Sequence, residues 1–303
     1  MKHNVRRILS LASVLVVGGA ALGMFAGCTT QHPEVTITYS FNGKDYSVRY
    51  ILSRNDAPRT VQHFLELADA GYYDGMCIHD YTSDALYTGG YRYDEKGELT
   101  EVDYWTTVKK LEEEQDITFT QSVWMNDAEK TPLYTVYGEF EENGVGTKYA
   151  RENRHSEGAL VMYYTAKGKL NEKQVPDVLV ERADGGANND GNATQLVKYN
   201  TNSATSLFYT YTGYANAMLD RNYCVFGTAD DDDYEKEFLN GLLAAIEEYE
   251  ANLDEEKSFT EEITWRKLNQ YDPFHAVVTA GEEAVYNTPV EPIILKSVKV
   301  NKY

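Results

Sequence analysis

The sequence predicts a mostly β domain, a barrel or a sandwich, enclosed by one early and one late helix. Short segments of alternating polar and apolar residues follow one another through the middle of the chain, with turn residues between them. Two stretches, 57–71 and 230–249, instead repeat their apolar residues at helical spacing. With 303 residues and a hydrophobic content of 42%, the chain can bury a sizeable core in one domain with insertions.

The N-terminus has the pattern of a secretion signal, because basic residues precede the apolar run ILSLASVLVVGGAALGMFAG, which ends at Cys28. The last residues of this segment, FAGC, resemble the bacterial lipobox. We therefore expect residues 1–27 to be a lipoprotein signal peptide, Cys28 to carry lipid, and residues 28–34 to form a tether. A permanent transmembrane anchor is the alternative, and the glycines that interrupt the run disfavour it. Lipid on Cys28 would anchor the chain stably to the cell membrane, on its extracytoplasmic side.

The charge balance is strongly acidic, with 28 Lys and Arg against 48 Asp and Glu. Loss of Lys2, Arg6 and Arg7 with the signal peptide leaves 25 basic residues and a net charge of −23. This charge argues against nucleic acid as a partner and against adhesion to an anionic membrane by charge alone. Beyond the lipidation site the cysteines are Cys77 and Cys224, so no disulfide framework exists, and two buried thiols are favoured over a single bridge.

The predicted elements begin with a β hairpin, in which residues 35–41 and 46–52 alternate around an Asn-Gly turn. The helix at 57–71 has proline in its first turn and glycine at its end. Strands follow in MCIHDYT, DITFTQSVWM, TPLYTVYGEF, GALVMYYTA and SLFYTYT. The acidic run Asp230–Asp233 is interpreted as the start of the late helix rather than a metal site, because carboxylates stabilise a helix N-terminus. A strand at 291–300 closes the chain.

Two segments interrupt this pattern and are interpreted as insertions. Residues 91–130 are charged and part helical around VKKLEEEQ, whereas residues 167–200 have the Gly and Asn content of a surface loop. The second segment carries oxygen atoms of the kind that calcium binds, at Asp184, Asn188, Asp190 and Asn192. Their spacing does not reproduce an EF-hand, so a plain loop is favoured. We expect no metal and no cofactor.

Four segments, in this order, are similar to those of one family, the cyclophilin-type peptidyl-prolyl cis-trans isomerases. They are APRTVQHFLELADAGYYDG at 57–75, IHDYTSDALYTGG at 78–90, EGALVMYYTA at 157–166 with NSATSLFYTYT at 202–212, and MLDRNYCVFGTA at 218–229. The resemblance implies a cyclophilin-like closed eight-stranded antiparallel barrel, capped by two helices, over residues 35–300. It also implies a shallow groove on the outside of the barrel that holds an X-Pro peptide.

The resemblance further implies the chemistry, which is rotation about a bond whose barrier is about 18–20 kcal/mol. In the family an arginine donates hydrogen bonds toward the proline nitrogen, and a glutamine and a backbone amide hold the neighbouring carbonyl. The matching positions here are Asp80 and Leu207. An ionised carboxylate has no hydrogen to donate, and leucine has no polar group. Activity is therefore expected to be weak or lost, unless Arg92, two residues after Gly90, supplies the missing cation.

The groove positions that the resemblance implies are altered as well. The pocket phenylalanine of the family falls at Ala85, which cuts an aromatic wall back to a methyl group. The pocket methionine falls at Leu86, and the glutamine before the double glycine falls at Thr88. The small Ala-Asn-Ala part of the groove matches Tyr163-Tyr164-Thr165, which should narrow or fill it. The remaining substrate-groove positions are Tyr209, Met218, Leu219 and Tyr223.

Residues that build the scaffold, such as His79, Gly89 and Phe208, are retained, so the fold is expected to be kept while the chemistry is not. The first function that follows is a membrane-anchored cyclophilin-like isomerase with weak or lost activity, a monomer that acts on proline-containing secreted or envelope proteins. The alternative is a non-catalytic module whose groove tyrosines hold an extended peptide, a partner protein or a glycan. Packing in or on the barrel would account for the same tyrosines without any ligand. An enzyme of another class has little support, because nucleophile-elbow, P-loop, dinucleotide and HExxH motifs are missing.

Overall fold

The computed structural model describes residues 32–144, 154–164, 177–182, 186–199, 203–254, 256–266 and 283–303. The expected signal peptide, the expected lipidation site Cys28 and the expected groove residue Thr165 lie outside the described residues. Pro33–Tyr303 forms one compact unit. Within the described residues, no helix combines the length and the apolar character needed to cross a membrane.

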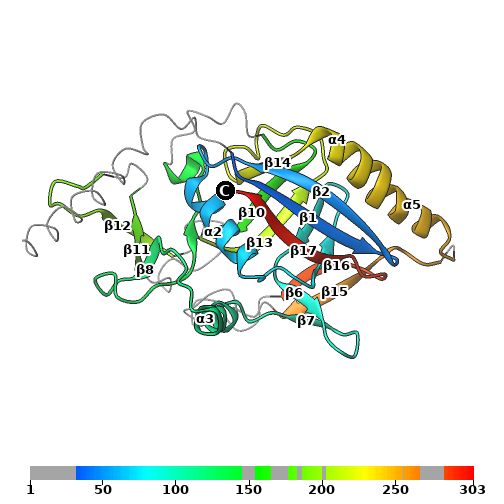
Figure 1. Ribbon diagram of the computed structural model, residues 1–303, viewed down its shortest axis with the longest axis horizontal. Helices are drawn as coiled ribbons and strands as arrows, with labels where there is room; N and C mark the ends of the chain where they lie inside the picture. Colours follow the sequence, from blue (N-terminus) through cyan, green and yellow to red (C-terminus); the bar gives the residue numbers. More distant parts are fainter. Residues whose placement is uncertain are drawn as a thin grey trace, which may run out of the picture. The chain divides into compact units, whose positions relative to one another are not determined.

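A curled antiparallel sheet dominates the structure (Figure 1), so the prediction of a mostly β chain is confirmed. Ten of the described strands belong to this sheet, in the order β3-β17-β1-β2-β14-β10-β13-β5-β4, with β9 paired to β13. The first and last strands lie side by side, because β17 pairs with β1. The strands of this sheet are β1 (Glu34–Phe41), β2 (Lys44–Leu52), β3 (Met76–Cys77), β4 (Asp80–Tyr81), β5 (Ala85–Thr88), β9 (Val136–Tyr137), β10 (Ala159–Tyr164), β13 (Ser203–Tyr211), β14 (Cys224–Ala229) and β17 (Ile294–Lys302).

The sheet forms a half-barrel rather than the expected closed eight-stranded barrel. Its end strands, β3 and β4, are consecutive in the chain but are not neighbours in the strand order of the described sheet. Between them the chain changes partner: Ile78 N donates to Ile293 O at 2.9 Å, and His79 N donates to Tyr87 O at 3.0 Å. The predicted strand MCIHDYT is therefore two short strands, because its first half pairs with β17 and its second half with β5. The covalent chain, rather than a continuous ladder, joins the two edges of the sheet.

The turn between β1 and β2 is the two-residue turn that the Asn-Gly pair predicts. Phe41 pairs with Lys44, and φ is 47° at Asn42 and 76° at Gly43. Positive φ at both central residues gives the turn a twist that matches that of its strands. The predicted alternation is confirmed by the buried residues of β1, which are Val35, Ile37, Tyr39 and Phe41.

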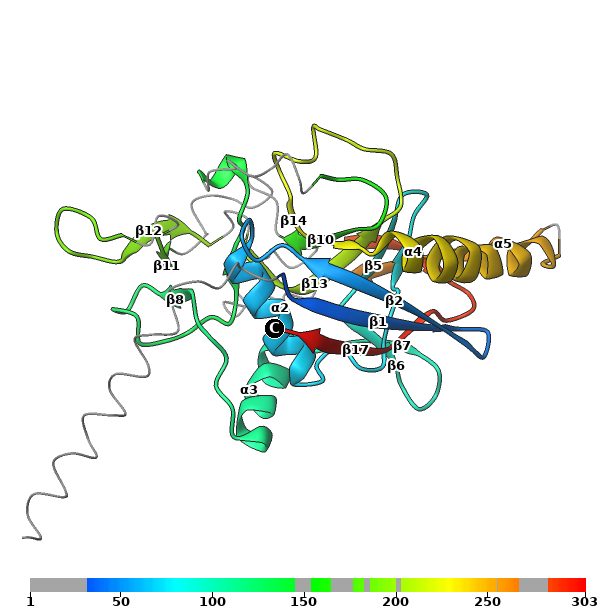
Figure 2. The ribbon, with the colours of Figure 1, turned by 45° about the horizontal axis from the view of Figure 1, so that its top comes forward.

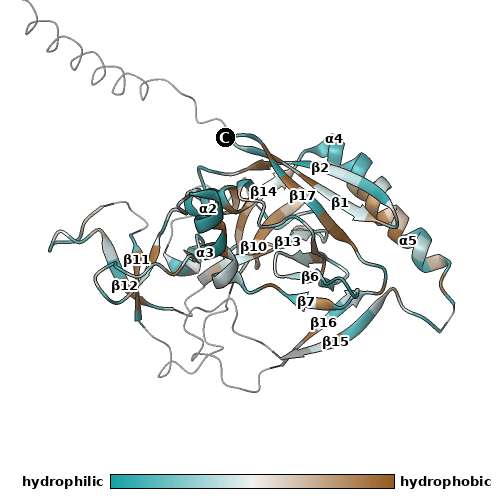
Figure 3. Ribbon diagram, turned by 60° about the horizontal axis from the view of Figure 1, so that its bottom comes forward, coloured by the Kyte–Doolittle hydropathy of each residue, from teal (hydrophilic) through white to brown (hydrophobic). Residues whose placement is uncertain are grey.

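The predicted early helix is α2 (Pro58–Asp69), which packs its apolar face into the core. Phe64 lies at the centre of an aromatic group, with its ring centroid 5.2 Å from Tyr73, 5.3 Å from Phe208 and 4.9 Å from Phe226. Figure 3 shows hydrophobic residues along β14, which supplies Phe226, and hydrophilic residues along the exposed start of the late helix. Phe64, Phe208 and Phe226, which match the motifs of the resemblance, thus belong to the core.

The N-terminus of α2 is capped by Glu139, a residue far away in the sequence. Its buried carboxylate accepts hydrogen bonds from Thr60 N at 2.8 Å and from Arg59 N at 3.2 Å. Two of the amides that a helix N-terminus leaves unpaired are thereby satisfied, and the negative charge is favourable at that end of the helix dipole.

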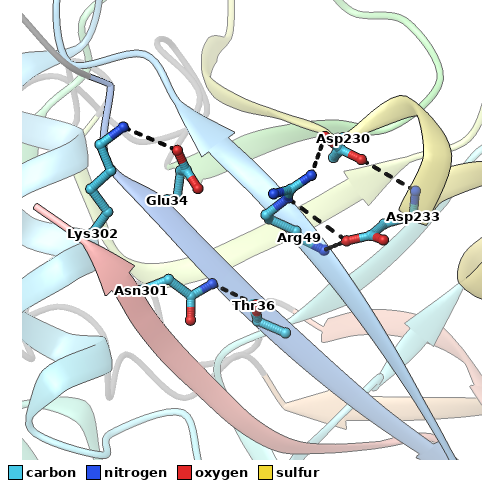
Figure 4. Close-up of polar contacts among 7 residues, drawn as sticks. All are labelled: Glu34, Thr36, Arg49, Asp230, Asp233, Asn301 and Lys302. Carbon is cyan, nitrogen blue, oxygen red and sulfur yellow. Dashed lines mark hydrogen bonds and ion pairs between the residues drawn. The ribbon is translucent and has the colours of Figure 1, made fainter.

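The late helix is continuous and consists of α4 (Asp231–Asp233), η2 (Tyr234–Leu243) and α5 (Ala244–Ala251), with π-helical turns in η2. It lies beside β2 (Figure 2). Asp230 accepts a hydrogen bond from Asp233 N, and Arg49 of β2 pairs with Asp230 at 2.6 Å (Figure 4). The interpretation of the acidic run as a helix start is confirmed, because its first carboxylate caps the helix.

The two insertions together build a second sheet of three strands, in the order β12-β11-β8. The first insertion supplies the hairpin β6 (Tyr91–Tyr93) and β7 (Leu99–Glu101), the helix α3 (Tyr104–Gln115) predicted around VKKLEEEQ, and β8 (Val123–Met125). The second supplies β11 (Asp177–Glu181) and β12 (Thr194–Lys198), so it contains more than the expected plain loop. A short helix, η1 (Glu141–Asn143), follows the first insertion. The small sheet has a core of its own, made of Val123, Leu133, Val178, Val180 and Tyr199.

The residues considered as calcium ligands fall in the turn between β11 and β12. Asn188 Oδ1 accepts from Asp190 N and from Asn192 N, both at 2.9 Å, and Asp184 lies outside the described residues. The side chain of Asn188 thus stabilises the turn by accepting hydrogen bonds from its backbone. In the described part of the chain, no group of three or more His, Cys, Asp and Glu side chains is arranged to hold a metal ion.

The hairpin of β15 (Thr260–Arg266) and β16 (Glu283–Pro289) has no counterpart in the sequence prediction. In the chain it lies between the late helix and β17, and in space it packs against β4. Thr288 Oγ1 donates to His79 O, and Asn287 N donates to Asp80 Oδ1, both at 2.8 Å. The hairpin is thereby attached to the very strand that carries the expected catalytic position.

Candidate functional site

Asp80 stands on β4 opposite Tyr87 of β5, and its side chain is half-buried. Burial raises the pKa of Asp80 above its ordinary value, and hydrogen bonds from Asn287 limit that rise. The negative charge of Asp80 adds to the effect of burial in raising the pKa values of Tyr87, Tyr163 and Tyr286. Asp80 therefore lies within electrostatic range of tyrosines from three strands, β5, β10 and β16.

His79, the residue before Asp80, is buried and packs the hairpin against β4. Its ring centroid lies 4.5 Å from that of Tyr91 and 5.0 Å from that of Tyr286. Burial lowers the pKa of His79 to about 3, so the ring is neutral at neutral pH. A neutral imidazole between two tyrosines holds the hairpin in place by packing.

A group of aromatic side chains, which we call the outer tyrosine cluster, consists of Tyr87, Tyr163, Tyr209 and Tyr223. The ring centroids lie 4.8 Å apart for Tyr87 and Tyr209, 5.9 Å for Tyr87 and Tyr163, and 6.3 Å for Tyr209 and Tyr223. Ala85 is buried in one hydrophobic cluster with Tyr209, and Tyr87 and Tyr223 pack against that cluster. Tyr209 is 4% exposed and Tyr163 is 39% exposed, which gives the cluster a buried base and an accessible rim.

Leu86 and Thr88, two of the expected groove positions, do not face this cluster. Leu86 belongs to the main core, and Thr88 Oγ1 donates to Cys77 O at 2.9 Å. The register explains their orientation: Tyr87 pairs with Tyr209 on the outer face, and neighbouring residues of a strand point to the opposite face. Pairing of β5 with β13 thus brings Ala85 and Tyr87 to the site instead.

The other expected groove positions differ in their burial, and not all of them contact the outer tyrosine cluster. Leu207 is half-buried on β13, close to a point where the register with β10 shifts. Of Tyr164 the structure describes the backbone pairing with Ala204. Leu219 packs against the outer tyrosine cluster, whereas Met218 is 81% exposed.

Arg92, the candidate replacement cation, stands on β6 and is exposed. Burial raises the pKa of the Cys77 thiol to about 12, and the charge of Arg92 partly opposes that rise. Burial and Asn287 are the causes of the shift at Asp80. The charge of Arg92 also lowers the pKa of Tyr72 against the effect of burial. Cys77 and Cys224 are both free and buried, so the expectation of two buried thiols is confirmed.

His155 is a member of the site that no local motif indicates, and its side chain is fully buried. Its Nε2 lies 2.9 Å from the Tyr209 hydroxyl, and its backbone N donates to Asp220 Oδ1 at 2.7 Å. Its Nδ1 lies 3.7 Å from the same carboxylate oxygen, which is beyond hydrogen-bonding distance. Burial lowers the pKa of His155 to about 4, against the attraction of Asp220. A separation of 65 residues between His155 and Asp220 hides this pair from any sequence pattern.

Comparison with known proteins decides the family. Residues 38–232 match the family model described as cyclophilin type peptidyl-prolyl cis-trans isomerase/CLD. The chain belongs to the cyclophilin family. This cyclophilin is similar to a solved Cryptosporidium parvum cyclophilin type peptidyl-prolyl cis-trans isomerase, with 14% identity and a TM-score of 0.40 over 90% of this chain and 99% of that chain. A structure of that isomerase in the presence of the dipeptide Ala-Pro is similar at 14% identity and a TM-score of 0.39, over 89% of this chain and 99% of that chain. No curated protein matches the sequence.

The family match separates two parts of this cyclophilin. Asp80, Leu207 and the outer tyrosine cluster fall inside the matched residues 38–232. The β15–β16 hairpin, at 260–289, begins after the match has ended. The segment that engages Asp80 therefore lies outside the matched residues.

Proposed function

We propose that this cyclophilin is a lipid-anchored protein of the cell envelope whose isomerase activity toward X-Pro bonds is weak or lost. The observation that supports this proposal is the environment of position 80. Where the family places a hydrogen-bond donor, Asp80 presents an acceptor, and its Oδ1 is already engaged by Asn287 N. Loss of one donor aimed at a transition state typically costs about 10²–10³ in rate. Leu207 removes a second polar contact, since leucine can neither donate nor accept.

A proline-peptide assay tests the loss of activity directly. The mature chain without lipid, residues 29–303, is added to a proline-containing peptide, and cis-to-trans conversion is followed by coupled proteolysis. We expect the rate to stay at or near that of the uncatalysed reaction as the protein concentration rises. The same protein after heat denaturation is the control. An acceleration that increases with native protein and saturates with peptide would contradict the proposal.

A second candidate function is a binding module without catalysis, and the accessible rim of the outer tyrosine cluster favours it. Tyr163 is 39% exposed above the buried ring of Tyr209, and tyrosine combines apolar area with a polar tip. A pull-down from cell-envelope extract, with wild type and a Tyr163→Ala, Tyr164→Ala variant, tests this role. We expect partners to be lost in the variant. Tyr214→Ala, which removes a tyrosine that is 89% exposed outside the cluster, is the matched control. Identical partner profiles in all three proteins would count against a role for this face.

The proposed anchor depends on one thiol, Cys28. In a bacterial host we expect the full chain to fractionate with membranes and to carry acyl groups at this residue, detected by mass spectrometry of the N-terminal peptide. Cys28→Ser removes the thiol that would carry the lipid, so the N-terminal peptide of this variant should carry no acyl group. Absence of acyl groups from the wild-type peptide, or their persistence in Cys28→Ser, would refute lipidation at this residue.

A further inference from the structure

The position that carries the family's cation carries an anion here, and none of the ion pairs among the described residues includes it. Asp80 is half-buried, and among the residues that the structure describes it forms no ion pair; its polar partner is Asn287. Removal of a carboxylate from water is costly unless a cation or several donors compensate it. The backbone N of Asn287, at 2.8 Å, compensates in part and is neutral. The charge of Asp80 therefore remains available to a positively charged ligand.

Tyrosines stand on the strands beside this charge: Tyr87 is the partner of Asp80 across β4 and β5, and Tyr286 precedes Asn287 on β16. Tyr87 and Tyr163 are perpendicular, with an interplanar angle of 90° and a centroid distance of 5.9 Å. Tyr286 stands in the electrostatic field of Asp80 and of Tyr163. The face of a tyrosine ring is electron-rich and attracts cations, more strongly where water is partly excluded. Tyr163 is 39% exposed and the other two rings are half-buried, so a side chain can approach from solvent.

We propose that Asp80, Tyr87, Tyr163 and Tyr286 bind the basic side chain, Arg or Lys, of an extended peptide. This inference rests on the proposed binding function, because it names the kind of peptide that the face of the outer tyrosine cluster binds. A guanidinium or ammonium group can pair with the carboxylate while its apolar stem and its charge lie over a tyrosine ring. An arginine at position 80 would repel the same client, whereas the aspartate attracts it. The net charge of −23 of the mature chain adds a long-range attraction of the same sign.

Two labelled peptides that differ in one side chain provide the test. One carries a central arginine and the other carries citrulline, which has the same shape without the charge. Fluorescence anisotropy with residues 29–303 measures the affinity for each. We expect the arginine peptide to bind about tenfold more tightly, as a partly desolvated cation–aromatic contact with an ion pair allows. The ratio of the two affinities should fall toward one as salt is added.

Variants of the protein test whether Asp80 and Tyr163 cause the preference for the arginine peptide. Asp80→Asn retains an oxygen that can accept from Asn287 N, so the hairpin contact is kept while the charge is removed; near-UV circular dichroism checks the fold. The affinity ratio should fall to about one in this variant. Asp232→Asn removes an equal charge from an exposed residue at the start of the late helix and should leave the ratio nearly unchanged. Tyr163→Ala should reduce the ratio in part.

Each outcome separates this inference from the proposed function. Equal affinities for the two peptides would overturn the inference and leave peptide binding intact. A tenfold preference that survives in Asp80→Asn would overturn the assignment to this site. Failure of both peptides to bind would overturn the inference and the binding role together, while leaving the loss of isomerase activity untouched.

Discussion

Acid should destabilise this cyclophilin through His155, and the size of the effect follows from its environment. The ring is fully buried, and its pKa in the folded protein is about 4, compared with 6.5 for an ordinary histidine. Because the folded pKa is the lower one, the unfolded chain takes up the proton first as the pH falls. The free energy of unfolding therefore keeps the full contribution of the neutral ring above about pH 6.5. It loses that contribution as the pH falls toward 4. At about pH 5 the loss amounts to about 2 kcal/mol, since one pKa unit corresponds to about 1.4 kcal/mol.

His155→Gln removes this titration while leaving a polar group near the Tyr209 hydroxyl. Urea unfolding of wild type and variant, at about pH 7.5 and about pH 5, measures the free energy of unfolding in each condition. The decrease between the two pH values should be smaller in the variant by about 2 kcal/mol. His63 and His79, whose pKa values burial lowers to about 4 and about 3, are present in both proteins, so their effects cancel in this comparison. Equal decreases in the two proteins would refute a buried, neutral His155.

Three further predictions concern the scaffold and the catalytic position. At Gly89, φ is +92° and a Cβ would lie 2.2 Å from Ser206 O, so Gly89→Ala should cost about 3 kcal/mol or more in urea unfolding. Gly97→Ala is the control, because it has positive φ but nothing within 4 Å, and it should cost about 1 kcal/mol. Glu139→Ala should cost about 1–2 kcal/mol by uncapping α2, and Glu139→Gln, which keeps an acceptor, should cost less; equal losses would contradict the capping role. Asp80→Arg should remain inactive in the proline-peptide assay, because the glutamine position is still apolar, and activity at the level of an ordinary isomerase would contradict the importance of that second contact.

Local pattern alone indicated much of the scaffold. The Asn42-Gly43 turn, the helix that starts at Pro58 and the cap at Asp230 were all predictable, because each depends on residues adjacent in the chain. The family motifs also placed Asp80 at the centre of the candidate site, and the structure brings Tyr163, Tyr209 and Tyr223 near one another on the same face.

The remaining parts of the site depend on partners that are distant in sequence. Leu86 was assigned to the groove by its place in a motif, but the pairing of β5 with β13 turns it into the core. Asn287 lies 207 residues from Asp80, and the hairpin that carries it lies outside the residues that the family model matches. The sheet of β8 and β11 likewise joins two insertions that looked independent.

By itself the sequence determined that this chain is a cyclophilin-like β domain with an acid at the catalytic position, because side-chain periodicity and short motifs specify which residues face the core. Only the tertiary structure decided what that acid does. Asp80 receives a hydrogen bond from the β15–β16 hairpin, and its charge acts on three tyrosines from three strands. Such contacts are set by strand register and by packing across large sequence separations, and no local pattern encodes them.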